Sequence, residues 1–195
     1  TERLFSSATA AGGSTYRFRF SRGNTGVINM FGFNAAGTTI LNVDTSAVVT
    51  AAAGWSHCLM SVNMADTAKR WQYINDVSRL TTVTTYTNDT IDFTQGDWAV
   101  GAFPDATGKM NGDLADLLFW PGVYLDLSVE ANRRMFISAS GRPVSPDIPA
   151  GAIATLGDPI VRQSNPLATW ETNLGSGGGF TEQGALTAAA SSPSQ

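Results

Sequence analysis

Apolar and polar residues alternate with a period of two along much of the first two thirds of the chain. The stretch TYRFRF places Tyr16, Phe18 and Phe20 on one face of an extended segment and the two intervening arginines on the other. This period is typical of β-strands that bury one face, and Gly-, Asn-, Asp- and Pro-rich turns separate the runs. The pattern predicts strands at residues 15–20, 26–33, 38–43, 54–64, 68–76, 77–87, 91–93, 97–103 and 114–120.

Two of these runs differ from the others in composition. Residues 54–64 are the longest apolar run, so we expect a central strand there. Residues 77–87 are rich in Thr and β-branched side chains, which favours an edge or solvent-facing strand.

One stretch, LSVEANRRMFIS, has a helical pattern. Ser128 is a candidate N-cap, and Val129, Arg133 and Phe136 fall near one helical face. A single short helix after many strands favours a β-sandwich or jelly roll over an α/β fold. We therefore predict an all-β protein with two antiparallel sheets face to face and one short helix near residues 128–138.

The character of the sequence changes after residue 138. Prolines and glycines are frequent in GRPVSPDIPAGA and NLGSGGGF, and the isolated apolar residues are too few to build a second core. We predict an N-terminal arm at 1–14, a sandwich at 15–138, and an extended segment at 139–195 that wraps over the sandwich or a neighbouring subunit.

Composition narrows the classes of function. The 195 residues suffice for one sizeable core. Charged residues make up 14% of the chain, the net charge is −4, and no Lys/Arg-rich run is present, so we expect no nucleic-acid partner. No apolar stretch approaches the ~18 residues of a membrane helix, so we expect no membrane partner. The single cysteine, Cys58, has no partner for an internal disulfide.

The segments GWSHCLMSV, RWQYINDV, GDWAVGAF and MNGDLADLLFW occur in an order that resembles laminin-G-like, concanavalin A-like jelly rolls. Trp55 and His57 match the strand that opens the central hairpin of that family. The sequence departs from the family pattern at Met110, where an aromatic residue is usual, and at Val77, where glycine is usual. The resemblance covers about residues 15–138 and implies a concanavalin A-like jelly-roll sandwich.

A second resemblance lies in the C-terminal part. LDLSVEANRRMFISASGRPVSP and the stretch that begins at PLATWETNLGSGGGF are similar to segments of tailed-phage virion proteins with a lectin-like jelly roll. Their N-x-G-x-G-G-x-F loop corresponds to Asn173–Phe180 here. The resemblance implies a decoration or tail-associated protein of the virion, a homo-oligomer or a subunit that binds other virion proteins. We expect Trp170, Asn173 and Phe180 to make contacts with a subunit or a glycan.

Glycan hydrolases of the concanavalin A-like fold resemble one another in an E-x-D-x-E strand, where the spacing of two aims all three carboxylates at one glycosidic bond. This chain has no such strand. Asp113 and Asp116 are three apart, as are Asp89 and Asp92, so a regular strand would send each pair to opposite faces. We therefore predict no catalytic residues and no enzyme activity. His57 is the only histidine, which disfavours a zinc site.

Calcium is the one cofactor that the sequence leaves open. Asp66, Asp89 and Asp105 are candidate ligands at the rim of a sandwich, and the alternative is that each bonds the backbone of its own turn. Two alternatives to the virion role also stay open: a carbohydrate-binding module for host-surface glycans, and an extracellular glycan hydrolase.

Overall fold

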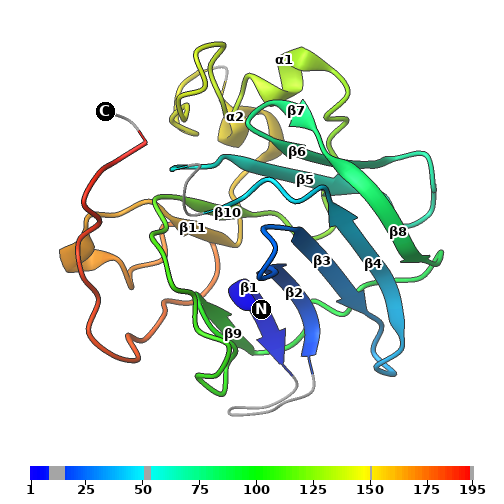
Figure 1. The fold of residues 1–195 in the computed structure, drawn as a ribbon, viewed down its shortest axis with the longest axis horizontal. Helices are drawn as coiled ribbons and strands as arrows, with labels where there is room; N and C mark the ends of the chain where they lie inside the picture. The colour runs from blue at the N-terminus through cyan, green and yellow to red at the C-terminus, as the bar shows by residue number, and fades with distance from the viewer. Residues whose placement is uncertain (9–15, 51–53, 150, 194–195) are drawn as a thin grey trace. The chain divides into compact units, whose positions relative to one another are not determined.

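The computed structural model describes residues 1–8, 16–50, 54–149 and 151–193 (Figure 1). The chain divides into two compact units, Thr1–Gly112 and Asp113–Gln195. Both units contain antiparallel sheet and little helix, so the predicted all-β class is confirmed. Within the described residues, no helix has the length and apolar character needed to cross a membrane.

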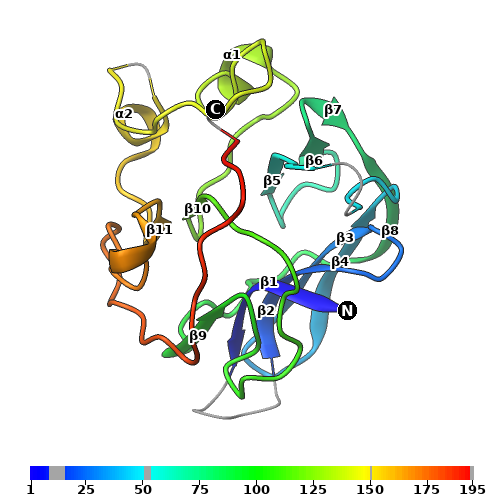
Figure 2. The same cartoon turned by 60° about the vertical axis from the view of Figure 1, so that its left-hand side comes forward.

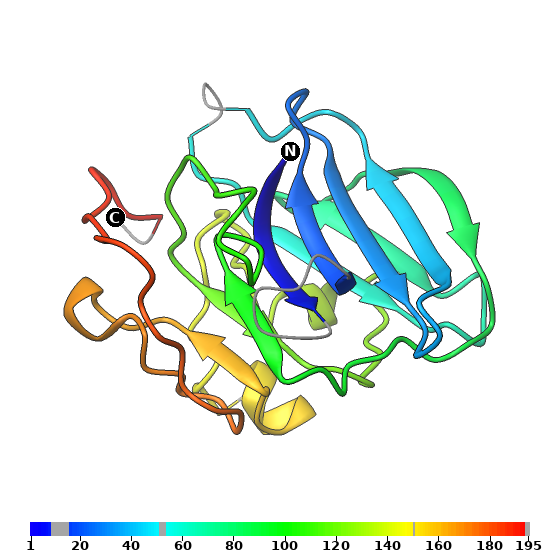
Figure 3. The ribbon, with the colours of Figure 1, turned by 90° about the horizontal axis from the view of Figure 1, so that it is seen from below.

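The larger sheet of the first unit has six antiparallel strands in the order β8-β4-β3-β2-β1-β9. Strands β1 to β4 follow one another as neighbours, and Figure 3 shows them side by side in blue and cyan. The Thr-rich strand β8 lies at one edge, as its composition predicted. The strands are β1 (Glu2–Ala8), β2 (Tyr16–Arg22), β3 (Ile28–Phe33), β4 (Thr39–Thr45), β8 (Leu80–Tyr86) and β9 (Asp97–Val100).

The smaller sheet of the first unit has three strands, β5 (Cys58–Val62), β6 (Arg70–Ile74) and β7 (Val77–Ser78). A two-residue turn, Asn75-Asp76, joins β6 to β7 with both φ angles positive, as in a type I′ hairpin. The central strand is β6, so the expectation that residues 54–64 form a central strand is wrong: β5 is at the edge of this sheet.

Buried side chains lie between the two sheets of the first unit, and one of them links β6 to β4. In Figure 2 the smaller sheet lies over β3, β4 and β8. The buried Gln72 of β6 donates from Nε2 to the Val43 carbonyl oxygen of β4 at 3.5 Å. Phe18, Met30 and Val43 are buried on successive strands of the larger sheet, because the period of two turns them all to the same side.

The described residues of the second unit form one small sheet and three short helical elements. Strand β10 (Leu117–Phe119) pairs with β11 (Val161–Gln163). The helices are α1 (Glu130–Arg133), α2 (Ala152–Leu156) and the 3₁₀ turn η2 (Leu167–Thr169). Among the described residues from 170 to 193 there is neither helix nor strand.

The prediction of one helix is corrected to two short α-helices in the described chain. Helix α1 is only four residues long, and its N-cap is Val129 rather than Ser128. Ser128 does not cap the helix because its backbone N–H and its hydroxyl both donate to Asp126 Oδ1, in the turn before the helix. Helix α2 was missed because five residues between Gly151 and Gly157 are too few to show a helical period.

Three segments differ from their predicted conformation. Glu2–Ala8, placed in an arm outside the sandwich, form β1 between β2 and β9. A register shift between Arg3 and Phe5 and the buried serines at 6 and 7 hide the alternation of this strand. Residues 91–93 are not a strand, and residues 114–116 precede β10 instead of belonging to it.

The boundary between the two units also differs from the predicted one. Residues 113–138 belong with the C-terminal segment, whereas the sequence placed them in the sandwich. The reason is local: β10, expected to close the sandwich, pairs with β11 at residues 161–163. The wrapping of 139–195 over the sandwich or a neighbouring subunit stays a prediction.

Candidate functional site

A hollow of about 350 Å³ opens where the β3–β4 turn meets the segment that follows β8. Both parts are irregular backbone, so their polar groups need side-chain partners, and several polar residues gather here. The hollow is lined by Asn34, Ala35, Ala36, Asp89, Thr90, Ile91, Asp92 and Thr94.

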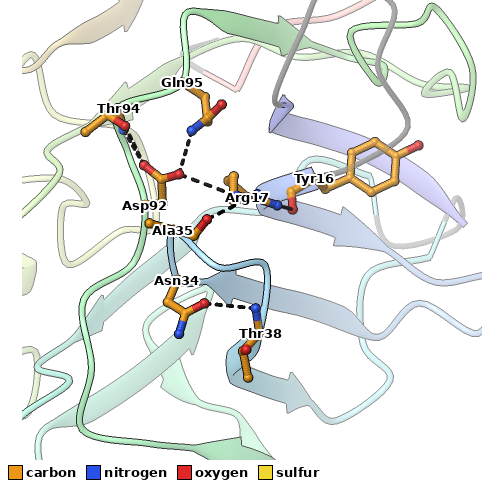
Figure 4. Close-up of polar contacts among 8 residues, drawn as sticks. All are labelled: Tyr16, Arg17, Asn34, Ala35, Thr38, Asp92, Thr94 and Gln95. Atoms are coloured by element: carbon orange, nitrogen blue, oxygen red, sulfur yellow. Dashed lines mark hydrogen bonds and ion pairs between the residues drawn. The ribbon is translucent and has the colours of Figure 1, made fainter.

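Asp92 is the buried acid of this hollow, with 7% of the residue exposed (Figure 4). Its Oδ1 accepts hydrogen bonds from the Thr94 backbone N–H at 3.0 Å and hydroxyl at 2.6 Å. Its Oδ2 accepts from Gln95 Nε2 and lies 3.4 Å from Arg17 Nε. The pKa of Asp92 is lowered, chiefly by the hydrogen bond from the Thr94 hydroxyl. Burial raises the pKa, but it only partly offsets this lowering.

Arg17 connects this acid to the β3–β4 turn. Its Nη2 donates to the Ala35 carbonyl oxygen at 3.4 Å. In the same turn the Thr38 N–H donates to Asn34 Oδ1 at 2.9 Å, as Figure 4 shows. Asn34 Nδ2 in turn donates to Asp89 Oδ2 at 2.8 Å. The polar groups around the hollow are therefore largely occupied by one another.

Asp89 and Asp92 line the same hollow, which corrects the expectation that their spacing separates them. That expectation assumed a regular strand, and residues 87–96 form none. Hydrogen bonds lower the pKa of both acids: from Asn34 and the Thr90 N–H for Asp89, and chiefly from Thr94 for Asp92. Glycoside hydrolysis needs one protonated carboxyl with a raised pKa, and neither of these acids has that property.

The three calcium candidates each bond the backbone of their own turn. Asp66 Oδ1 accepts from the Ala68 N–H at 3.0 Å, Asp89 Oδ1 from the Thr90 N–H at 2.7 Å, and Asp105 Oδ1 from the Thr107 N–H at 2.9 Å. No cluster of three or more His, Cys, Asp or Glu suited to a metal ion occurs in the part of the chain that the structure describes. The geometry matches turn aspartates, the alternative that the sequence offered.

Asp113 and Asp116 are in irregular backbone before β10, and both are exposed. The protein around Asp116 still raises the pKa of its carboxyl by burial, and the charge of Arg162 partly offsets this. Arg162 itself pairs with Asp147. Because residues 113–116 form no strand, strand geometry does not send Asp113 and Asp116 to opposite faces.

The side-chain amide of Asn173 binds the backbone of the glycine-rich loop and of the chain around β11 through both its oxygen and its nitrogen. Its Oδ1 accepts from the N–H of Arg162 at 2.8 Å and of Gly175 at 3.0 Å. Its Nδ2 donates to the carbonyl oxygens of Ile160 at 2.8 Å and Gly178 at 3.1 Å. These four bonds leave the amide little capacity for a ligand, so the structure assigns Asn173 a role inside the loop.

The loop approaches the chain before β11 so closely that glycine is required. A Cβ at Gly175 would lie 2.6 Å from the Pro159 carbonyl oxygen, and one at Gly177 would lie 2.6 Å from the Ile160 carbonyl oxygen. The loop therefore lies directly against the chain before β11 at Gly175 and Gly177.

Trp170 and Phe180, the other two predicted contact residues, are half-buried. Trp170 follows η2, and the Phe180 N–H donates to the Glu171 carbonyl oxygen at 3.0 Å. More accessible are three leucines of the same segment, Leu167, Leu174 and Leu186, at 43–46% exposed. Leu174 and Leu186 do not stand out in the sequence, because a single apolar residue in an irregular segment shows no period.

His57, the sole histidine, lies beside the β6–β7 turn. Its backbone N–H donates to Asn75 Oδ1 at 2.8 Å, and its carbonyl oxygen accepts from the Asn75 N–H at 2.9 Å. Burial lowers the pKa of His57 to about 4, although the charge of Asp76 partly offsets the shift. The imidazole is therefore neutral at physiological pH. Burial also raises the pKa of the neighbouring Cys58 thiol to about 12, which keeps it unreactive.

Comparisons with protein-family models, curated proteins and solved structures give no match for this chain.

Proposed function

We propose that the chain is a non-catalytic structural protein of a tailed-phage virion, with a lectin-like jelly roll of the concanavalin A type. In this proposal it decorates the capsid or belongs to the tail and binds neighbouring subunits, other virion proteins or copies of itself, through residues 113–195. The resemblance of the C-terminal segments to virion proteins motivates the proposal, and the accessibility of that segment supports it.

The observation that carries the docking role is where the exposed apolar side chains lie. Of the eight large apolar residues exposed in the described chain, two are in the first unit, Val77 and Val83. The other six are in the second unit: Val123, Val129, Ile148, Leu167, Leu174 and Leu186. Residues 181–191 are exposed without exception. Apolar side chains on an extended, accessible segment are typical of chains that order further when they bind a partner.

The pKa values and positions of the acidic residues support the part of the proposal that assigns no enzyme activity to the chain. Asp89 and Asp92 share a hollow, but both have lowered pKa values, so neither serves as the proton donor of a carboxylate pair. Asp116 has a raised pKa but lies in irregular backbone in the other unit.

An add-back experiment tests the docking role. Particles that lack this chain are incubated with the purified protein, and the bound fraction is measured after sedimentation. A variant with Leu167→Ser, Leu174→Ser and Leu186→Ser is expected to bind at least tenfold more weakly than the parent. The matched control replaces Val77 and Val83 by Ser, which removes exposed apolar residues from the first unit only. Equal binding of the leucine variant, or equal loss in the control, would contradict the proposed role of residues 113–195.

The hollow at Asn34 supports a second candidate, a carbohydrate-binding module. It combines the accessible Asp89 carboxylate with the apolar surfaces of Ala35 and Ile91, a mixture that suits a sugar ring. A glycan array with the parent and an Asp89→Ala variant tests this candidate. Binding that is lost in the variant would favour the module, whereas no signal on the array would exclude a neutral-glycan site here.

A further inference from the structure

A second hollow of about 350 Å³ lies on the polar face of the six-stranded sheet. Strand register brings its lining together. Arg3, Ser21, Asn29 and Asp44 are direct cross-strand neighbours on β1, β2, β3 and β4, and Arg19 is directly opposite Phe31 in the next row. The sequence showed arginines alternating with aromatic residues on β2, but it could not show which residues of the other strands lie beside them.

Arg3 and Arg19 are both held by an aromatic ring. The guanidinium of Arg3 lies 4.1 Å from the centroid of Phe103, and that of Arg19 lies 3.6 Å from the centroid of Phe31. A ring contact occupies the flat face of a guanidinium, whereas its N–H groups point outward in the plane. These contacts therefore fix the two cations without satisfying their hydrogen-bond donors.

Three donor nitrogens of the two arginines lack acceptors. Arg3 is only 9% exposed, and its Nε and Nη1 are buried without a hydrogen-bond partner, as is Arg19 Nε. Neither guanidinium makes an ion pair with a carboxylate of the described residues. Buried donors are paired in most proteins, so unfilled ones at a hollow call for a ligand that accepts hydrogen bonds.

The local charge is also uncompensated. Burial above all, together with the charge of Arg3, lowers the pKa of Arg19 to about 10, while Tyr16 and Asp44 act in the opposite direction. Asp44 is engaged by the side-chain amide of Asn29. The side chains that line the hollow include two guanidinium groups and one carboxylate, so these side chains leave one positive charge in excess.

We propose that the hollow lined by Arg3 and Arg19 binds the carboxylate group of a small ligand or residue. A carboxylate presents two acceptor oxygens, which match the in-plane donors of a guanidinium. It carries one negative charge, which equals the excess on the side chains, whereas a dianion such as phosphate carries more than this excess and is repelled about twice as strongly by Asp44. None of the lining residues belongs to the hollow at Asn34 or to residues 113–195, so the proposal depends on neither proposed function.

The test is a titration of the full chain with sodium acetate, sodium phosphate and glucose, followed by NMR shifts of the arginine side-chain and backbone N–H groups. Acetate is expected to shift signals of Arg3, Arg19 and Ser21 saturably and to bind at least fivefold tighter than phosphate. Glucose is expected to cause no shift. No saturable shift with acetate, or tighter binding of phosphate, would overturn the proposal.

Variants connect the binding to the two arginines. Arg19→Gln is expected to weaken acetate at least tenfold, and Arg19→Lys, which keeps the charge but loses the planar fork, severalfold. The matched control is Arg70→Gln, since Arg70 also stacks on a ring, 5.2 Å from the centroid of Tyr86, but away from this hollow. Unchanged binding in both Arg19 variants, or an equal loss in the control, would contradict the assignment.

Two larger probes then distinguish the sources of the carboxylate. Glucuronate represents a sugar acid, and the amide of N-acetylglutamate represents an acidic side chain. A tenfold preference for either one over acetate supports the proposal and identifies the source. If both probes bind more weakly than acetate, the hollow is an adventitious anion site only, and the proposal is overturned.

Discussion

Arg17 Nε lies 3.4 Å from Asp92 Oδ2, and the two side chains are only 11% and 6% exposed. This ion pair joins strand β2 to the segment after β8, and through the Ala35 carbonyl oxygen it also contacts the β3–β4 turn. Three segments far apart in sequence therefore meet at one pair of charges. The pair shapes the hollow at Asn34 and should contribute to the stability of the first unit.

Replacement of Asp92 by Asn is expected to lower the free energy of unfolding by about 3 kcal/mol, because it leaves Arg17 as a buried charge without its partner. Urea denaturation followed by tryptophan fluorescence measures this change. The control is Asp66→Asn, which removes an exposed pair with Lys69 and should change stability much less, because solvent screens the pair. Equal effects of the two variants would show that the Arg17 pair is no stronger than a surface contact.

The glycine-rich loop offers a comparison between two adjacent positions. Gly177→Ala places a Cβ 2.6 Å from the Ile160 carbonyl oxygen, whereas a Cβ at Gly178 meets no atom within 4 Å. We expect Gly177→Ala to destabilise the second unit by about 1–3 kcal/mol, as overpacking does. Gly178→Ala should lie within about 0.5 kcal/mol of the parent. Hydrogen exchange of the Gly177 and Leu174 amides reports the change, and similar exchange in both variants would refute the close approach.

The low pKa of His57 predicts a dependence of stability on pH. The folded pKa is about 4 and the reference value is 6.5, so the unfolded chain binds a proton more readily between these values. The contribution of the neutral His57 imidazole to the stability of the fold is therefore fully present above about pH 6.5, and it is lost as the pH falls toward 4. Thermal melts at half-unit steps should show this decline, and His57→Gln should flatten it. A decline of the same slope in the variant would assign the effect to other groups.

The strand pattern of the first unit was visible in the sequence because β3, β4 and β6 bury alternate residues, which leaves a period of two. Strand β8 buries no residue, and its Thr-rich, β-branched composition is what indicated it. Strand β1 was not visible, since its register shift and buried serines break that period. The meeting of Asp89 with Asp92 and of Arg3 with Arg19 was also hidden. Such encounters depend on loop paths and cross-strand register, which no local spacing encodes.

Truncation separates the exposed tail from the glycine-rich loop. Removal of residues 165–195 would also delete Asn173 and its bonds to Ile160 and Arg162, so loss of docking could reflect unfolding. Removal of residues 181–195 keeps the loop. We expect this shorter truncation to leave the melting temperature within about 2 °C of the parent, since residues 181–191 are exposed, and to reduce docking to particles severalfold. A large drop in melting temperature would instead place the tail in the core.

The most direct test of the proposed function is a count of this chain in purified particles by quantitative mass spectrometry. In the proposal a phage encodes the chain, and its particles are purified by density gradient and washed in high salt before digestion. The proposal predicts the chain at a fixed number of copies per particle, unchanged by the wash. Its absence from particles, or recovery only from the culture supernatant, would contradict a structural role in the virion.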